Sequence, residues 1–148
     1  MFKHILVPVD GSPFAHQAVD KARAIACAFR SSVTLIHVID PYGFNGRGAD
    51  FPRDQSDYLR AATEQANEAI GAARQVFEAR GMSVKGSVVE GHSVYQAILE
   101  AAETLEADLV VMGSHGRRGL EKPVLGSVTA QVLSHAHLPV LVVRNEGA

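Results

Sequence analysis

Apolar residues gather in five short runs along the chain, separated by longer segments of mixed polarity. The runs are residues 5–9, 33–39, 108–112 and 139–143, with a weaker one at 82–89. Most of them are continuously apolar instead of alternating with polar residues, which is typical of parallel strands that helices cover on both faces. We therefore predict five parallel β-strands.

The segments between the runs carry apolar residues at helical spacing. The three clearest patterns consist of Ala15, Ala18, Ala22, Ile25 and Phe29, of Leu59, Ala62, Ala66, Ile70, Ala73 and Phe77, and of Val94, Ile98, Ala101 and Leu105. Ser12 as N-cap and Pro13 as first helical residue begin the first helix, and Gly81 ends the second. Ser93 and Gln96 have the spacing of a capping box at the start of the third.

A fourth helical segment, from about Ser127 to His135, completes the alternation of strands and helices. The alternation predicts an α/β fold, an open doubly wound parallel sheet with right-handed crossovers and helices on both faces. The length of 148 residues predicts a single domain over residues 1–148. One connection, residues 40–54, has three glycines, two prolines and no periodicity. A loop of this length is either a flexible functional lid or a tolerated surface insertion.

Composition and charge restrict the classes of partner. A formal net charge of −2 gives no basic field that would draw the chain onto nucleic acid or an anionic membrane. The apolar stretch near the N-terminus is too short for a signal peptide or a membrane span, so we expect a cytoplasmic protein with no membrane insertion. The single cysteine, Cys27, agrees with a reducing compartment. Its place in a helical pattern favours a small buried side chain over a reactive thiol.

Ligands of doubly wound sheets bind beyond the carboxyl ends of the strands, where the strand order changes direction. The first strand ends in PVDGS, residues 8–12, and lacks the three-glycine fingerprint of a dinucleotide-binding Rossmann domain. A carboxylate at this turn would repel a pyrophosphate lying on the first helix. Asp10 can instead accept hydrogen bonds from ribose hydroxyls or help to hold a cation.

The fourth strand leads into a glycine-rich loop, GSHGRRGLEKPVLGSVT, which spans residues 113–129. Glycine permits positive φ and close approach of main-chain N–H groups, so Gly113 and Gly116 can form an anion-binding concavity. Gly126 and Ser127 open the fourth helix, whose unpaired N–H groups and dipole favour a phosphate. The loop therefore suits a polyphosphate. Its cationic side chains are Arg117, Arg118 and Lys122.

Four positions of this loop, Gly113, Gly116, Gly126 and Ser127, form the pattern G-x2-G-x9-G-S. The pattern resembles the nucleotide signature of the universal stress protein family, in its ATP-binding subgroup. The start of the chain, HILVPVDGSPFAHQAV, and its end, SVTAQVLSHAHLPVLVVR, are similar to the first and last elements of that family. The resemblance covers essentially the whole chain. Pro123 departs from it, because relatives more often carry a large apolar residue there, and it removes a backbone donor from the loop.

The resemblance implies a sheet of order 3-2-1-4-5, like that of the adenine nucleotide α-hydrolases, with ATP bound between strands one and four. By position, Asp10 meets the ribose and Pro8 lines the cleft, while Val38 and Met112 flank the adenine. Carried over in the same way, the residues that hold the phosphates are Gly113, Gly116, Gly126, Ser127 and Val128. Arg117 joins them as a cofactor-binding residue because it is a cationic side chain of the loop. A Mg²⁺ ion is expected near Asp10 and the phosphates, with no metal site made by the protein alone.

The histidines offer other candidate chemistry. His135 and His137 suit neighbouring positions on one face of a strand, but no cysteine or carboxylate nearby completes a metal ligand set, which favours a surface connection. His37 alternates with apolar residues in the second strand, which favours a satisfied interior histidine. His115 lies inside the phosphate loop, where ligand contact and loop packing remain equal alternatives.

No order of nucleophile and base indicates catalysis, and Asp10 is expected near the sugar rather than the γ-phosphate. We therefore predict no catalytic residue and a nucleotide-binding regulatory protein of the stress response, whose bound ATP stabilises one conformation or assembly. The alternatives are a slow ATPase or related adenine-nucleotide hydrolase, and a scaffold in which ATP is structural. The apolar last strand, residues 138–144, is an exposed sheet edge, which predicts a homodimer or a tetramer built from it. The regulated protein partner is not identified by the sequence.

Overall fold

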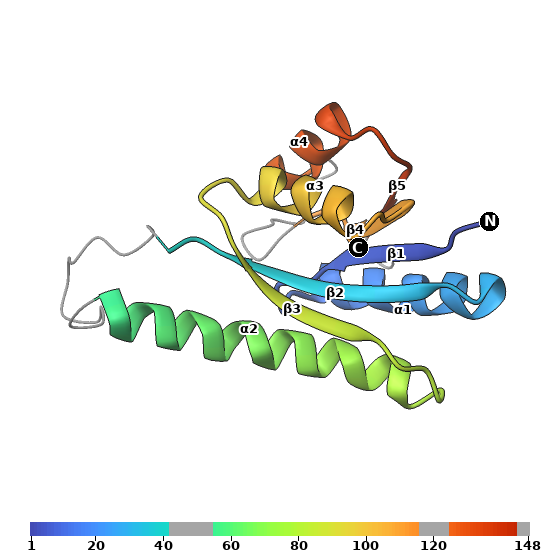
Figure 1. Cartoon of the computed structure of the whole chain (residues 1–148), viewed down its shortest axis with the longest axis horizontal. Coiled ribbons are helices and arrows are strands. Elements are labelled where there is room, and N and C mark those ends of the chain that lie inside the picture. The colour runs from blue at the N-terminus through green and yellow to red at the C-terminus, as the bar shows by residue number, and fades with distance from the viewer. Residues whose placement is uncertain (42–54, 116–124, 145–148) are drawn as a thin grey trace.

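The computed structural model describes residues 1–41, 55–115 and 125–144, in which strands and helices alternate as the pattern predicts (Figure 1). The strands are β1 (His4–Pro8), β2 (Ser32–Ile39), β3 (Lys85–Glu90), β4 (Leu109–Gly113) and β5 (Val140–Val143). The helices are α1 (Pro13–Phe29), α2 (Gln55–Glu78), α3 (Val94–Thr104) and α4 (Ser127–His135). The segment 40–54 lies outside the described residues from residue 42 onward.

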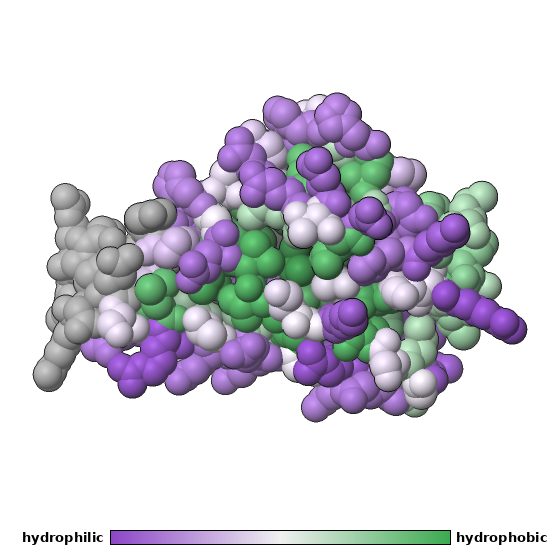
Figure 2. Space-filling view, in the orientation of Figure 1, coloured by the Kyte–Doolittle hydropathy of each residue, from purple (hydrophilic) through white to green (hydrophobic). Residues whose placement is uncertain are grey.

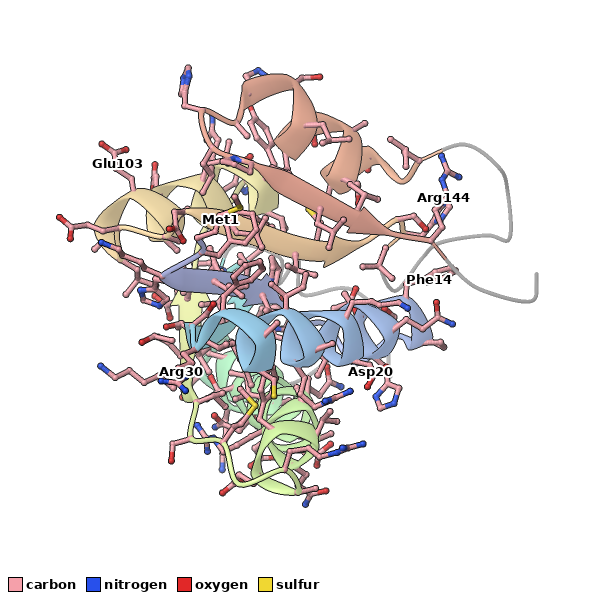
Figure 3. The ribbon with its side chains drawn as sticks, turned by 90° about the vertical axis from the view of Figure 1, so that its right-hand side faces the viewer. Met1, Phe14, Asp20, Arg30, Glu103 and Arg144 are labelled. Carbon is pink, nitrogen blue, oxygen red and sulfur yellow. The ribbon has the colours of Figure 1, made fainter. Side chains whose placement is uncertain are left out.

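The strands form one parallel sheet of order β3-β2-β1-β4-β5, which confirms the expected order. The chain builds outward from β1 to β3 on one side and then returns to add β4 and β5 on the other. Strand order therefore reverses between β1 and β4. Helices α1 and α2 cover one face of the sheet, and α3 and α4 cover the other, as two views at right angles show (Figures 1 and 3).

Successive strand residues point to opposite faces, so each inner strand contributes to two separate cores. The core on the α1 and α2 side includes Ile5, Val7, Leu35, Val111, Ala18, Ala22, Ile70 and Phe77. The core on the α3 and α4 side includes Leu6, Ile36, Val110, Met112, Ile98 and Val132. This burial on both faces explains why the strands are continuously apolar. Figure 2 shows apolar residues gathered along the middle of one side of the molecule, with hydrophilic residues above and below.

The predicted helix ends are formed by specific hydrogen bonds. The Ser12 side chain accepts the backbone N–H of Ala15 at 3.2 Å, and Pro13 begins α1. After α2, Gly81 takes φ of 74°, and the Met82 N–H donates to the Phe77 carbonyl oxygen at 3.0 Å, which is the Schellman ending that favours glycine. The expected capping box at α3 is wrong, because Ser93 is the N-cap residue but makes no side-chain capping hydrogen bond.

Two expectations for the surface of α1 are also wrong. The buried side chains of α1 are Phe14, Ala15, Ala18, Val19, Ala22 and Ala26. Cys27 follows Ala26 and is turned about 100° around the helix axis, so its side chain is exposed rather than buried. Phe29, expected on the apolar face, is 45% exposed and packs edge-on against the ring of Phe2. No helix among the described residues is long and apolar enough to cross a membrane.

Asp108 fastens the start of β1 to the start of β4. Its carboxylate accepts the backbone N–H groups of Lys3 at 2.9 Å and of His4 at 3.0 Å, and its own N–H donates to the His4 carbonyl oxygen at 2.9 Å. Desolvation raises the pKa of Asp108, but the hydrogen bonds from Lys3 and His4 outweigh it and hold the pKa below its ordinary value of 3.8. The charged carboxylate therefore stabilises the pairing of the two central strands.

Replacing Asp108 by alanine should lower the free energy of unfolding at pH 7 by about 1 kcal/mol, because the half-buried carboxylate is partly screened by water. A lowered folded-state pKa means that this stabilisation exists above the unfolded-state pKa and is lost as pH falls through the folded-state pKa. Urea unfolding between pH 7 and pH 3 should therefore show wild type and Asp108→Ala converging at the acid end. Asp20→Ala, which removes an exposed pair with Arg23, is the control and should change little. A loss independent of pH would contradict the role of the charge.

Candidate functional site

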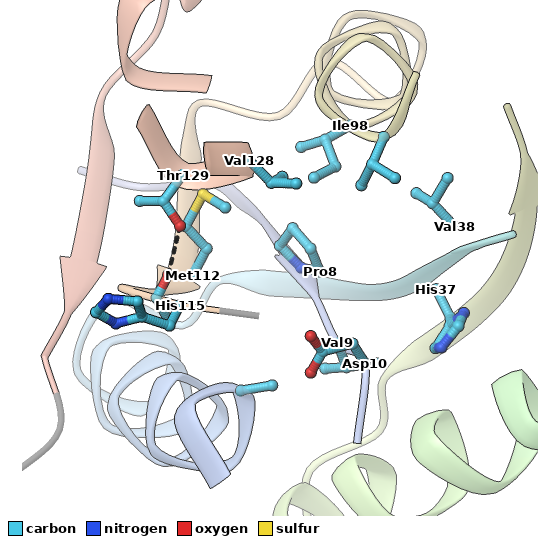
Figure 4. A pocket seen from close by; sticks show the side chains of 13 residues that line it. Pro8, Val9, Asp10, His37, Val38, Ile98, Met112, His115, Val128 and Thr129 are labelled. Carbon is cyan, nitrogen blue, oxygen red and sulfur yellow. Dashed lines mark hydrogen bonds between the residues drawn. The ribbon is translucent and has the colours of Figure 1, made fainter. Parts of the chain in front are cut away.

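A pocket lies where the strand order reverses, beyond the carboxyl ends of β1 and β4 (Figure 4). Its lining comes partly from strands and the residues just after them, and partly from helices. The first group is Pro8, Val9, Asp10, His37, Val38, Met112, Gly113 and His115. The second group is Ala15, Val94, Ile98, Val128 and Thr129. The cavity volume is about 110 Å³. One water needs about 10–15 Å³ by the same measure, so the pocket admits a group several times larger than water.

The two ends of the pocket differ in chemistry. In Figure 4, Val38 and Ile98 lie toward one end, and His115 and Thr129 lie toward the other. The first end is lined mainly by aliphatic side chains, with His37 on the same side, and suits a flat apolar ring. The second lies beside the first turn of α4 and is the more polar of the two. A ligand that spans the pocket therefore needs an apolar part and a polar part.

Asp10 lies between these ends, with its carboxylate turned into the pocket (Figure 4). Its Oδ1 accepts the backbone N–H of Ser12 at 2.9 Å, and Gly11 between them takes φ of 81°. The turn holds one carboxylate oxygen in place within the pocket lining. Because a carboxylate only accepts hydrogen bonds, Asp10 is suited to ligand hydroxyls.

Gly113 is required by close packing rather than by its φ. A Cβ at this position would lie 2.8 Å from the carbonyl carbon and oxygen of Phe14 in α1. Among the described glycines, those with positive φ are Gly11 and Gly81, so the positive φ that we considered for Gly113 is wrong. Only a residue without a side chain lets the end of β4 lie against the first turn of α1.

The base of the glycine-rich loop is closed by hydrogen bonds between β4, α4 and β5. The Gly126 N–H donates to the Ser114 carbonyl oxygen at 2.8 Å, and the Ser114 N–H donates to the Val143 carbonyl oxygen at 3.0 Å. The Thr129 hydroxyl donates to the Gly113 carbonyl oxygen at 2.9 Å, the dashed line in Figure 4. Gly126 is the N-cap of α4 and supplies no capping side chain. The first turn of α4 therefore presents N–H groups and the positive end of the helix dipole.

The structure brings most of the predicted site residues together. The pocket lining contains Pro8, Asp10, Val38, Met112, Gly113 and Val128. Gly126 and Ser127 lie immediately before Val128 at the start of α4. Gly116 and Arg117 lie outside the described residues, as do Arg118, Lys122 and Pro123.

Several lining residues were missed by the sequence analysis. They are Val9, Ala15, Val94, Ile98 and Thr129. Val94 and Ile98 belong to the apolar face of α3 and look like ordinary core residues in the sequence. The spacing of a helix does show that they share a face, but it does not show that this face borders a pocket.

The histidines occupy three different environments. His37 is half-buried and lines the pocket instead of lying wholly in the interior. His115 lines it too, and its ring packs at a tilt against Phe14 while its Nδ1 lies 3.1 Å from the Ser114 hydroxyl, which are loop-packing contacts. His135 lies against the ring of Tyr95 and within 2.9 Å of the Gln131 carbonyl oxygen. Within the described ranges, no group of three or more His, Cys, Asp or Glu is placed to hold a metal ion.

Comparison with known proteins gives a consistent result. Residues 1–144 match the sequence model of the universal stress protein family. Universal stress protein MJ0531 of Methanocaldococcus jannaschii is 37% identical over 145 residues, which is 97% of this chain and 83% of that protein.

Solved structures agree with the sequence comparison. The structure of protein MJ0577 of the same organism is 30% identical, covers 100% of this chain and 99% of its own, and superposes with a TM-score of 0.81. A universal stress protein in complex with cAMP is 27% identical, with coverages of 96% and 97% and a TM-score of 0.71.

Replacing Gly113 by alanine should lower the free energy of unfolding by about 1–3 kcal/mol, because the new methyl group meets backbone atoms of Phe14 that cannot rotate away. Gly71→Ala is the matched control. Gly71 lies inside α2 with no atom within 4 Å of an added Cβ, so alanine there should raise stability by up to about 1 kcal/mol. Urea unfolding of both variants measures the difference, and equal stabilities would contradict the close approach.

Proposed function

Because the chain belongs to the universal stress protein family, we propose that it is a regulatory protein of the stress response whose state depends on bound ATP. The observation that carries the proposal is the pocket at the strand-order reversal. It has an aliphatic end, a fixed carboxylate in the middle and the uncapped start of α4 at its polar end. These three features match a base, a ribose and a phosphate chain in that order.

In the proposed complex the adenine lies at the aliphatic end, flanked by Val38 and Met112 and edged by Pro8. The ribose hydroxyls donate to the carboxylate oxygen of Asp10 that Ser12 does not occupy. A relative that is 27% identical has been solved in complex with cAMP, which supports an adenine nucleotide as the ligand class. We propose ATP and not a monophosphate as the ligand, because the sequence of the glycine-rich loop is long enough to surround several phosphates.

The phosphates are assigned to the backbone N–H groups at the start of α4, with Gly113, Gly126, Ser127 and Val128 around them. Gly116 and Arg117 complete this end in the proposal. A Mg²⁺ ion fits the donor set, because Mg²⁺ is usually held by phosphate oxygens with one or two carboxylates. Asp10 is the carboxylate among the described residues that line the pocket, so the ion is expected between it and the phosphates, held mainly by phosphate oxygens and water.

We assign binding rather than hydrolysis as the function. Hydrolysis of ATP uses a residue that orients the attacking water next to the γ-phosphate. In the part of the chain that the structure describes, the carboxylate of the pocket is Asp10, which lies toward the middle of the pocket rather than beside the start of α4 (Figure 4). Bound ATP then acts by linkage and favours the conformation or assembly that binds it better. A slow ATPase is the alternative that the experiment below separates.

Residues 138–144 form the proposed homodimer contact, and a tetramer is the alternative assembly. β5 is the last strand of the sheet, and Leu141 in it is 39% exposed. An apolar strand edge of this kind is usually paired or covered. We place the protein in the cytoplasm, which suits its one unpaired cysteine. Its regulated partner protein remains to be found by experiment.

The replacement Asp10→Asn tests the nucleotide assignment. Asparagine keeps an oxygen for the Ser12 N–H but puts an amide NH₂, which cannot accept a hydrogen bond, where the ribose should donate. Wild type should bind ATP about tenfold or more tightly than 2′,3′-dideoxy-ATP, and Asp10→Asn should lose most of that preference. Isothermal titration calorimetry measures all four affinities.

Asp20→Asn, on the exposed side of α1, is the control for this comparison and should bind like wild type. Multiple-turnover assays on the same samples decide between the two functions. Retained ATP without turnover supports the regulatory role. Rapid ADP formation would replace it with an ATPase, and the absence of any affinity for adenine nucleotides would sink the proposal.

The dimer contact is tested by Leu141→Lys, which places a charge on the β5 edge. If the edge pairs with a second copy, sedimentation should show a dimer for wild type and a monomer for this variant. Leu133→Lys is the matched control, because Leu133 is also exposed, at 42%, but belongs to α4 and not to β5. Dissociation by Leu133→Lys instead of Leu141→Lys would move the interface to α4.

A further inference from the structure

Thr129 is a polar side chain buried at the polar end of the pocket. It is 2% exposed and lies in the first turn of α4, two residues after Ser127. A buried hydroxyl without a partner costs free energy, so the direction of its hydrogen bond shows what the residue holds. The hydroxyl of Thr129 donates to the Gly113 carbonyl oxygen at 2.9 Å (Figure 4).

This hydrogen bond joins two elements rather than stabilising one helix. A threonine inside a helix often bonds a carbonyl oxygen of its own preceding turn. Thr129 instead reaches the last residue of β4, on the opposite side of the polar end of the pocket. The bond therefore fixes the distance between the end of β4 and the start of α4.

Gly113, which accepts this hydrogen bond, is itself held in place by close packing. On the side facing α1, the backbone of Phe14 lies so close that a Cβ would meet it at 2.8 Å. On the other side, the Gly113 carbonyl oxygen accepts from Thr129. A second tie, from the Gly126 N–H to the Ser114 carbonyl oxygen at 2.8 Å, holds the residue that precedes α4. Ser127 and Val128 thus lie, in sequence, between Gly126 and Thr129, which hydrogen-bond to the end of β4 and to the residue that follows it.

We propose that Thr129 is a positioning residue for the phosphate end of the pocket, holding the N–H groups at the start of α4 at a fixed distance from β4. The inference rests on the proposed function, because it concerns the same nucleotide site. The hydroxyl of Thr129 is used by the Gly113 carbonyl oxygen. Its effect is therefore on the phosphates through the backbone and not on the base or ribose.

Thr129→Val and Thr129→Ser separate the hydroxyl from the volume of the side chain. Valine has nearly the same shape without the hydroxyl, and serine keeps the hydroxyl without the methyl group. Affinities for ATP, AMP and adenosine are measured by isothermal titration calorimetry. Thr129→Val should weaken ATP and AMP by about fivefold or more and leave adenosine within about twofold. Thr129→Ser should restore ATP affinity to near the wild-type value.

The adenosine measurement distinguishes positioning from a general loss of structure. Equal weakening of all three ligands by Thr129→Val, or unchanged ATP affinity, would overturn the inference while leaving the proposed function in place. If wild type bound none of ATP, AMP and adenosine, both this inference and the proposed function would be wrong. If Thr129→Val does not fold, Thr129→Ser and Thr129→Ala make the same comparison, since they also differ by the hydroxyl alone. Their ATP affinities should differ by about fivefold and their adenosine affinities should agree.

Discussion

The contact between the end of β4 and the first turn of α1 is the constraint on which the site depends. Because Gly113 has no side chain, β4 lies directly against the backbone of Phe14, and α1 itself begins just after β1 with the Ser12 cap. The end of β1, the start of α1 and the end of β4 are therefore placed together. The pocket opens beside this contact and is lined by residues of α3 and α4 and by Ala15 of α1. A glycine that looks like part of a ligand loop is first of all a packing residue.

The fold was predictable because its signals are local or periodic. Continuous apolar runs follow from burial on both sheet faces, and the helix ends depend on residues close in the sequence. The Ser12 side chain caps α1, Pro13 supplies a helical φ at its first position, and Gly81 ends α2 with a positive φ. The predictions failed where the outcome depends on the exact direction of a single side chain. Cys27 lies next to the buried Ala26, and a pattern of alanines does not fix which side of a helix edge faces water. Ser93 has the spacing of a capping box, but spacing does not determine the rotamer that would complete it.

The candidate site was predictable in part for the same reason. Asp10 and the residues around Gly126 lie at strand ends and a helix start, positions that the order of elements brings together. Thr129 and Ile98 could not be assigned from the sequence, because their roles depend on which face of α4 or α3 meets β4 across the sheet. Such contacts join segments distant in the chain and leave no periodic signal. The reason for Gly113 was likewise hidden, since only the position of Phe14 in space reveals it.

The proposed ligand would bind across β1 and β4, the neighbouring strands with the fewest described residue pairs in the sheet. β1 pairs with β2 along its whole length from His4 to Pro8, but its described pairing with β4 is confined to Ile5 and Leu6. On the β4 side, the Ser114 N–H donates to Val143 of β5 and the Ser114 carbonyl oxygen accepts from Gly126 of α4, so Ser114 links these two elements. A nucleotide held by Asp10 on one side and by α4 on the other joins the two halves. In the proposed complex, its binding would therefore act on their relative position, and through Ser114 on the edge strand, without any chemical step. The size of that effect is bounded by the difference in nucleotide affinity between the two arrangements. Under the proposed function, a ligand bound across this short β1–β4 pairing would therefore regulate the protein by its occupancy alone.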